Sequence, residues 1–127
     1  MTGIATLATT AIMCDEPVRL ARFYAAALDW TVLTAQPEFA WISAEQHSGT
    51  GLVFCRSRDY QVPNWPDDEL PFHIDLYVDS IDDAEQRLIE LGATKPAFQP
   101  NDYGSLVILL DPSGQPFCIS PTPSRAE

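Results

Sequence analysis

The residues of this chain best suited to chemistry alternate along one predicted strand, residues 72–78. His73, Asp75 and Tyr77 fall on one face of that strand, and the opposite face is apolar, made of Phe72, Ile74, Leu76 and Val78. An imidazole beside a carboxylate can act as a general base, so His73 and Asp75 are the predicted catalytic residues. Tyr77 suits a cavity wall. A histidine that only hydrogen-bonds its neighbours would show the same pattern, and both interpretations stay open.

The cysteines offer a second kind of chemistry. Cys55 and Cys118 each follow a phenylalanine near the end of a predicted strand, and thiolate and imidazole together are good zinc ligands. Free cysteines in strands are also common as small buried apolar residues, which is the interpretation that we give to Cys14. The chain has only 3 cysteines and no C-x-x-C pair, so a disulfide framework is not expected.

These candidates belong to a pattern that occurs twice along the chain. A predicted strand at 5–13 leads into a helix that ends near Leu28, and the strand at 72–78 leads into a helix that ends at Leu91. Short apolar runs follow each helix, at 31–36, 39–43 and 51–56 and then at 95–98, 105–110 and 116–120. A repeated strand–helix–strands unit predicts an α+β fold built from two copies.

The helix limits have recognisable signals. Asp15 is the predicted cap of the first helix, with Pro17 in its first turn and Asp29 in a left-handed conformation at its end. The predicted core stripe of this helix is Leu20, Phe23, Tyr24, Ala27 and Leu28. Ser80 and Asp83 form a capping-box-like start for the second helix, and Gly92 stops it. The stripe of the second helix is Ile81, Ala84, Leu88 and Leu91.

Length and composition predict one domain. The 127 residues can form one continuous core, with a first module at about 4–57, a linker at about 58–70 and a second module at about 71–121. The formal charge of −11 argues against nucleic acid and anionic membranes as partners and would suit a cationic ligand. No apolar run has the length of a membrane span, and no secretory signal is recognisable, so we expect a cytoplasmic protein.

Three ordered motifs carry a resemblance to a known superfamily. They lie at Asp15–Trp30, at His73–Asp79 and at Asp111–Cys118, which includes the turn Asp111-Pro112-Ser113-Gly114. The chain resembles the vicinal oxygen chelate superfamily, which includes glyoxalases, bleomycin-resistance proteins and extradiol dioxygenases, and within it the short glyoxalase-like proteins. The resemblance implies two βαβββ modules whose curled mixed sheets form a concave pocket, and a homodimer.

The resemblance also implies where a metal would lie. The positions that correspond to the superfamily's metal ligands are Thr9, Cys55, His73 and Cys118, and only His73 has the usual residue type. Manganese, nickel or iron chemistry of that superfamily needs hard oxygen and nitrogen ligands. We therefore predict no bound metal and no cofactor, while a zinc site made of Cys55, His73 and Cys118 remains an alternative.

Two functions follow from these residues, and the sequence does not decide whether the chain is an enzyme. The first is a protein that binds a small organic molecule in the sheet cavity without the usual catalytic divalent metal. Its predicted ligand-binding residues are Thr9, Trp41, Cys55, His73, Asp75, Tyr77 and Cys118. The alternative is a lyase, isomerase or hydrolase of a small carbonyl compound that uses His73 as general base or a Cys/His metal site.

Overall fold

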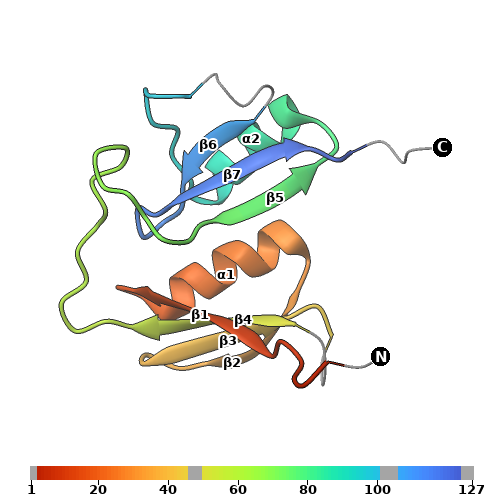
Figure 1. Ribbon diagram of the computed structural model, residues 1–127, viewed down its shortest axis with the longest axis vertical. Helices are drawn as coiled ribbons and strands as arrows, with labels where there is room; N and C mark the ends of the chain where they lie inside the picture. Colours follow the sequence, from red (N-terminus) through yellow and green to blue (C-terminus); the bar gives the residue numbers. More distant parts are fainter. Residues whose placement is uncertain (1–2, 46–49, 101–105, 124–127) are drawn as a thin grey trace. The chain divides into compact units, whose positions relative to one another are not determined.

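The computed structural model describes residues 3–45, 50–100 and 106–123 (Figure 1). The chain forms two compact units, residues 1–60 and residues 61–127. Each unit contains one helix and one mixed sheet, so the predicted α+β class is confirmed. Ser105, the first residue of one predicted strand, lies outside the described residues. None of the helices in the described ranges is long and apolar enough to cross a membrane.

The first unit has the predicted βαβββ order. It consists of β1 (Thr9–Cys14), α1 (Pro17–Leu28), β2 (Thr31–Ala35), β3 (Phe39–Ser43) and β4 (Gly51–Arg56). The strand order in the sheet is β1-β4-β3-β2, with β1 parallel to β4 and the other pairs antiparallel. The first strand is shorter than predicted, because residues 5–8 lie before it.

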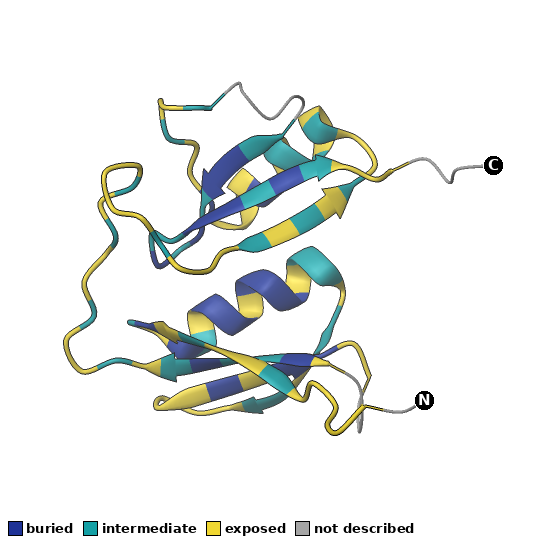
Figure 2. Ribbon diagram, in the orientation of Figure 1, coloured by how far each residue is buried: buried dark blue, intermediate teal, exposed yellow. Residues whose placement is uncertain are grey.

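Helix α1 covers one face of this sheet. Leu20, Phe23 and Tyr24 are buried as predicted, and the ring of Tyr24 stacks on that of Phe54 at 5.6 Å between centroids. Alternation puts Phe54 on the face toward α1 and Cys55 on the opposite face, which is the more exposed one (Figure 2). The sheet therefore has a core face and an open face.

The ends of α1 agree with the sequence in all but one respect. Asp29 has the predicted left-handed conformation, with φ 57°, and Pro17 opens the helix. The cap, however, is Glu16 and not Asp15, and the Glu16 side chain makes no capping hydrogen bond. Asp15 instead accepts a hydrogen bond from the Glu16 backbone N–H at 2.9 Å, because it lies one residue too early to reach the first turn.

The second unit has three strands and one helix. These are β5 (Ile74–Val78), α2 (Ile81–Leu91), β6 (Val107–Leu110) and β7 (Pro116–Pro121), with strand order β5-β7-β6. β5 is parallel to β7, and β6 is antiparallel to it. Ser80 caps α2 by accepting a hydrogen bond from the Asp83 N–H at 3.3 Å, and Gly92 ends the helix with φ 127°, as predicted.

The predicted strand at 95–98 is not formed. Only Thr94 pairs with Leu110 in an isolated bridge, and Pro96 has no N–H to continue a ladder. The side chain of Gln99 takes the place of the missing backbone. Its Oε1 accepts from the Ile108 N–H at 2.9 Å, and its Nε2 donates to the Ile108 carbonyl at 2.8 Å.

Two apolar faces of the second unit are more open than predicted. Leu88 is buried, but Leu91 in the same stripe is 45% exposed. Phe72, which the alternation places with Ile74 on the inner face, precedes the strand and is exposed, because β5 begins only at Ile74. Phe117 and Ile119 of β7 are fully buried and form the core of this unit.

Candidate functional site

The candidate site lies on the face of the second sheet opposite Phe117 and Ile119. In the parallel ladder of β5 and β7, Asp75 is the direct partner of Cys118, and Tyr77 is the partner of Ser120. Side chains of paired residues project to the same side of a sheet, so Asp75 and Cys118 are neighbours. The register thus brings together two residues that are far apart in the sequence.

His73 joins this pair from the residue just before β5. Its Nε2 lies 3.0 Å from Asp75 Oδ1, and both side chains are about half exposed or more. One ligand atom each from His73, Asp75 and Cys118 lie within 4.8 Å of one another. The predicted pairing of His73 with Asp75 is therefore present, and Cys118 is the third member of the cluster.

The Cys118 thiol is held in its protonated form. Partial burial, followed by the negative charge of Asp75 and a hydrogen bond to that carboxylate, raises the pKa of Cys118 from 9.0 to about 11. A thiol with this pKa carries almost no thiolate at neutral pH. Cys118 is consequently not an activated nucleophile in this arrangement.

A cavity of about 230 Å³ lies beside the cluster. His73 and Cys118 contribute to its wall, whereas Tyr77 is 70% exposed and is not among the described lining residues. The other described lining residues are Trp65, Pro66, Asp68, Glu69, Leu70, Ile108 and Pro116. The wall is mainly apolar, with an acidic edge formed by Asp68 and Glu69.

Half of the cavity wall comes from the segment at about 58–70, which the sequence predicts only as a linker. Its turn is held by the Asn64 N–H, which donates to Asp68 Oδ2 at 2.7 Å, and the Trp65 ring meets Phe98 edge-on at 5.5 Å. Val62 lies against Gly114, where an added Cβ would come within 2.5 Å of it. The signal available in the sequence was Trp65, a large apolar residue within a polar, proline-rich stretch.

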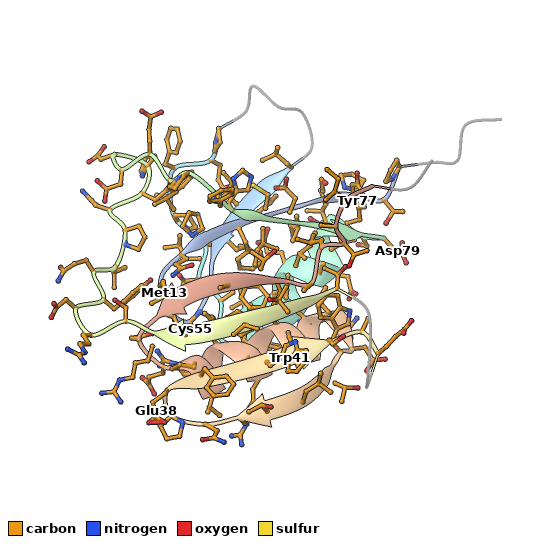
Figure 3. The ribbon with its side chains drawn as sticks, turned by 60° about the horizontal axis from the view of Figure 1, so that its bottom comes forward. Met13, Glu38, Trp41, Cys55, Tyr77 and Asp79 are labelled. Carbon is orange, nitrogen blue, oxygen red and sulfur yellow. The ribbon has the colours of Figure 1, made fainter. Side chains whose placement is uncertain are left out.

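The remaining predicted ligand-binding residues lie on the open face of the first sheet. Thr9 pairs with Gly51, Trp41 with Val53, and Cys55 with both Met13 and Phe39. Figure 3 shows Met13, Trp41 and Cys55 on the strands of this sheet in front of α1. Trp41 is 37% exposed, and its indole lies over Gly51, where a Cβ would come within 2.7 Å of Nε1.

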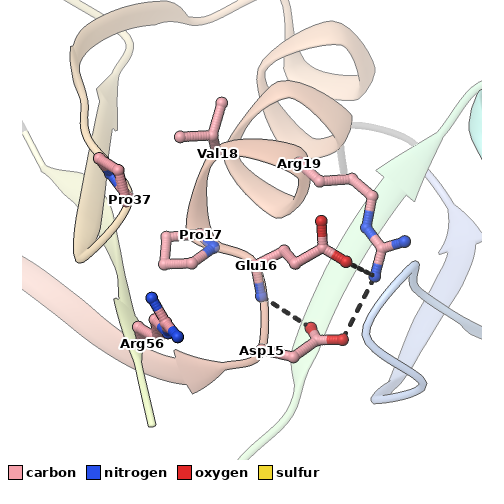
Figure 4. A pocket seen from close by; sticks show the side chains of 7 residues that line it. All are labelled: Asp15, Glu16, Pro17, Val18, Arg19, Pro37 and Arg56. Atoms are coloured by element: carbon pink, nitrogen blue, oxygen red, sulfur yellow. Dashed lines mark hydrogen bonds and ion pairs between the residues drawn. The ribbon is translucent and has the colours of Figure 1, made fainter. Parts of the chain in front are cut away.

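A second cavity, of about 310 Å³, lies at the start of α1 (Figure 4). Arg19 Nη2 lies 3.3 Å from Asp15 Oδ2 and 3.3 Å from Glu16 Oε2, so its single positive charge is shared between the two carboxylates beside the helix start. The other lining residues are Pro17, Val18, Pro37 and Arg56. None of the predicted site residues lines this cavity, and its ion pairs stabilise the turn between β1 and α1.

Comparison with known proteins now identifies the family. The model of the glyoxalase-like domain matches residues 9–120, nearly the whole chain. The chain belongs to the glyoxalase-like domain family. This confirms the resemblance to the vicinal oxygen chelate superfamily. Among curated protein sequences, none matches the chain significantly.

Solved structures of other glyoxalase-like proteins share the fold. A glyoxalase/bleomycin resistance protein/dioxygenase family enzyme from Burkholderia phytofirmans superposes with a TM-score of 0.64 at 19% identity, covering 91% of this chain and 97% of the other. A glyoxalase family protein from Enterococcus faecalis has a TM-score of 0.62 at 21% identity, covering 91% and 97%. At these identities the likeness establishes the fold.

A third glyoxalase-like structure contains a metal. It is a fosfomycin resistance protein from Listeria monocytogenes, solved with Mn(II) and 1S,2S-dihydroxypropylphosphonic acid. Its TM-score with this chain is 0.65 at 12% identity, covering 92% of this chain and 90% of the other.

The four residues that the resemblance assigns to the superfamily's metal positions do not suit a hard divalent metal. Thr9 and Cys55 lie in the first unit, and His73 and Cys118 lie in the second. Together they offer a neutral hydroxyl, two thiols and a single imidazole, and the Cys118 thiol is protonated. Manganese and iron(II) sites are built mainly from carboxylate and imidazole ligands, so this set does not reproduce the superfamily's usual centre.

Proposed function

We propose that this glyoxalase-like protein binds a small organic cation in the cavity of its second unit, without the usual catalytic divalent metal of the superfamily. The observation that supports this proposal is the cavity of about 230 Å³, in which apolar walls meet two carboxylate side chains. Ligand sites are mostly apolar cavities with a few convergent polar groups. The volume is below the ~300–1,000 Å³ of drug-sized sites, which favours a small ligand.

The lining residues explain the preference for a cation. A cation can be attracted to the face of the Trp65 ring. Asp68 and Glu69 place negative charge at the edge of the cavity. The formal charge of −11 adds a long-range attraction for cations. Leu70 and Ile108 supply apolar contact for the organic part of the ligand.

The proposal is tested by thermal unfolding of the full chain with a panel of small ammonium and guanidinium compounds, each paired with a neutral compound of the same shape. A ligand that binds only the native state raises the melting temperature in proportion to its concentration over its Kd. We expect stabilisation by at least one cation and not by its neutral counterpart. No stabilisation by any cation would contradict the proposal.

Glu69→Gln tests the location of the site. Glu69 lines the cavity, whereas Asp68 also holds the turn through Asn64, so Glu69 is the cleaner choice. Removal of the carboxylate should weaken binding of the cation by roughly 5-fold to 30-fold, as expected for loss of a charged partner worth about 1–2 kcal/mol. Glu90→Gln, an exposed change on α2, should leave the affinity unchanged.

The second candidate is an enzyme that uses His73 as general base. The contact of 3.0 Å between His73 Nε2 and Asp75 Oδ1 supports it, because a carboxylate can orient an imidazole and stabilise its protonated form. His73 also lines the cavity. Turnover of a small carbonyl compound that is lost in His73→Asn, with ligand binding retained, would establish this activity; turnover retained in that variant would exclude it.

We further propose a cytoplasmic homodimer. Exposed apolar side chains on the open face of the first sheet support the dimer, notably Met13, Phe39 and Trp41. A second copy of the chain would remove this apolar area from water. Thr9, Trp41 and Cys55, which the sequence predicts as ligand contacts, lie on this same sheet face and are not among the described lining residues of the second-unit cavity.

A further inference from the structure

The cluster of His73, Asp75 and Cys118 has the composition of a metal site that differs from the superfamily's set. Its three ligand atoms, an imidazole nitrogen, a carboxylate oxygen and a sulfur, lie within 4.8 Å of one another. All three residues belong to the second unit. Thr9 and Cys55 are not members of this cluster, and Asp75 is.

The backbone of the sheet holds these residues together. Asp75 and Cys118 are direct partners in the ladder between β5 and β7, and His73 lies two residues before Asp75 on the same side. Ligands around a tetrahedral zinc lie about 3.3–3.7 Å apart, given bond lengths of about 2.0–2.3 Å. The 3.0 Å contact of His73 with Asp75 and the 4.8 Å limit of the cluster are on either side of this range. Binding of an ion therefore requires side-chain rotations that bring the three ligand atoms into this range.

The donor types select the ion. Imidazole and thiolate favour zinc over manganese or magnesium, and carboxylate completes many three-ligand zinc sites. A neutral imidazole, a carboxylate and a thiolate balance the two positive charges of the ion. Three protein ligands leave a fourth position, and since His73 and Cys118 line the cavity, a ligand held there can reach it.

We propose that His73, Asp75 and Cys118 bind a zinc ion on the second sheet. Binding forms one bond each to the imidazole nitrogen, the carboxylate oxygen and the sulfur, and the proton of the Cys118 thiol passes to solvent. The hydrogen bond between Cys118 and Asp75 is replaced by their shared bonds to the ion. Zinc binding needs only these three side chains and not the proposed organic ligand, so a test with the metal alone can fail or succeed whatever the outcome of the ligand test.

The test uses the full reduced chain, freed of metal with a chelator and titrated with Zn²⁺ and with Co²⁺. We expect one equivalent of Zn²⁺ to raise the melting temperature. Co²⁺ should give a sulfur-to-metal charge-transfer band together with the strong visible bands of a four-coordinate site. Excess Mg²⁺ or Mn²⁺ should not displace either ion. Absence of the charge-transfer band would overturn the proposal.

Variants identify the ligands. Cys118→Ser should abolish the charge-transfer band, and His73→Ala and Asp75→Asn should each weaken Co²⁺ binding by more than the 10-fold to 100-fold typical of changes around the ligands. Cys55→Ser and Asp82→Asn are the matched controls and should bind Co²⁺ with the same affinity as the unchanged protein. A band that survives Cys118→Ser, or one that is lost in Cys55→Ser, would contradict the site.

A second measurement uses the unchanged protein, so that the site can be tested even if a ligand variant folds poorly. In the unchanged protein, Zn²⁺ should slow the already slow alkylation of Cys118 by iodoacetamide relative to the metal-free protein and leave the rate at Cys55 unchanged, as read by mass spectrometry of the peptides over time. Equal protection of both cysteines, or of neither, would contradict a site built on Cys118 alone.

Discussion

At the scale of the residue, the chemistry of this protein depends on what surrounds Cys118. Partial burial and the carboxylate of Asp75 together raise the pKa of the thiol to about 11, so it is a neutral hydrogen-bond donor at physiological pH. His73 Nε2 contacts the same carboxylate at 3.0 Å. Asp75 is therefore the shared partner, and substitutions at Asp75 should alter the properties of both His73 and Cys118.

Asp75→Asn should make Cys118 more reactive toward iodoacetamide. The substitution removes the negative charge that disfavours the thiolate, while burial, the largest cause, remains. At pH 8 in a chelator, the alkylation rate of Cys118 should rise roughly 3-fold to 10-fold, since one pKa unit changes the thiolate fraction tenfold. In the unchanged protein the rate should climb with pH through about pH 11, where the thiol is half ionised, and level off only above it.

The control for this experiment is Asp82→Asn on α2, which should leave the rate at Cys118 unchanged. Both rates are followed by mass spectrometry of the peptide that contains Cys118. A rate in Asp75→Asn that equals or falls below that of the unchanged protein would show that the carboxylate does not hold the thiol in its protonated form.

At the scale of the element, each sheet depends on one residue with a particular structural role. Gln99 substitutes for a strand along the edge of β6, where Pro96 prevents a regular ladder. In the first sheet, Gly51 leaves room for the indole of Trp41. Neither role follows from secondary-structure propensity, because both depend on a residue in a neighbouring strand, nine or ten positions away.

Gln99→Met should destabilise the second unit. The change keeps the size of the side chain but leaves the N–H and carbonyl of the buried Ile108 without their partners. We expect a loss of about 1–3 kcal/mol in the free energy of unfolding, measured by urea denaturation. Gln86→Met, on the exposed side of α2, is the control and should change stability by less than about 0.5 kcal/mol. Equal stability of the two variants would refute the role of Gln99.

Gly51→Ala should destabilise the first sheet and move Trp41. The new methyl group would lie 2.6 Å from the Ile42 carbonyl oxygen and 2.7 Å from Trp41 Nε1, and the first of these is backbone that cannot turn away. Overpacking of this kind costs about 1–3 kcal/mol. Thermal unfolding and tryptophan fluorescence should both change, whereas Gly3→Ala, whose nearest atom is at 3.7 Å, should change neither.

At the scale of the whole molecule, each unit repeats the same plan of a mixed sheet with one amphipathic helix. The copies have diverged in their open faces. The first presents Met13, Phe39 and Trp41, and the second presents the polar cluster with the cavity beside it. An apolar face suits association, and a polar cluster beside a cavity suits recognition of a ligand.

Phe39→Glu should convert the proposed dimer to monomers. Phe39 is 40% exposed on the open face of the first sheet, and a charge there would oppose burial against a second copy. Light scattering after gel filtration should give a dimer mass for the unchanged protein and a monomer mass for the variant. Ile89→Glu on α2, where Ile89 is 41% exposed, should remain dimeric. A monomeric unchanged protein would exclude the proposed dimer.

The sequence by itself determined the repeated strand–helix–strands plan, the ends of α2 and the division of each strand into two faces. These features depend on periodicity and on local caps, which neighbouring residues set among themselves. It also identified His73 and Asp75 as a pair, since they lie two apart on one strand. The zinc alternative that it left open, however, paired Cys118 with Cys55 and not with Asp75.

Only the tertiary structure decided that Asp75 lies opposite Cys118, that Gln99 replaces a strand and that side chains from residues 65–70 wall a cavity. Alternation along a strand tells which face a side chain occupies, but the residue beside it depends on the register with a strand some forty positions away. That register is set by the packing of the whole unit. The chemistry of this protein therefore depends on contacts that no local pattern specifies.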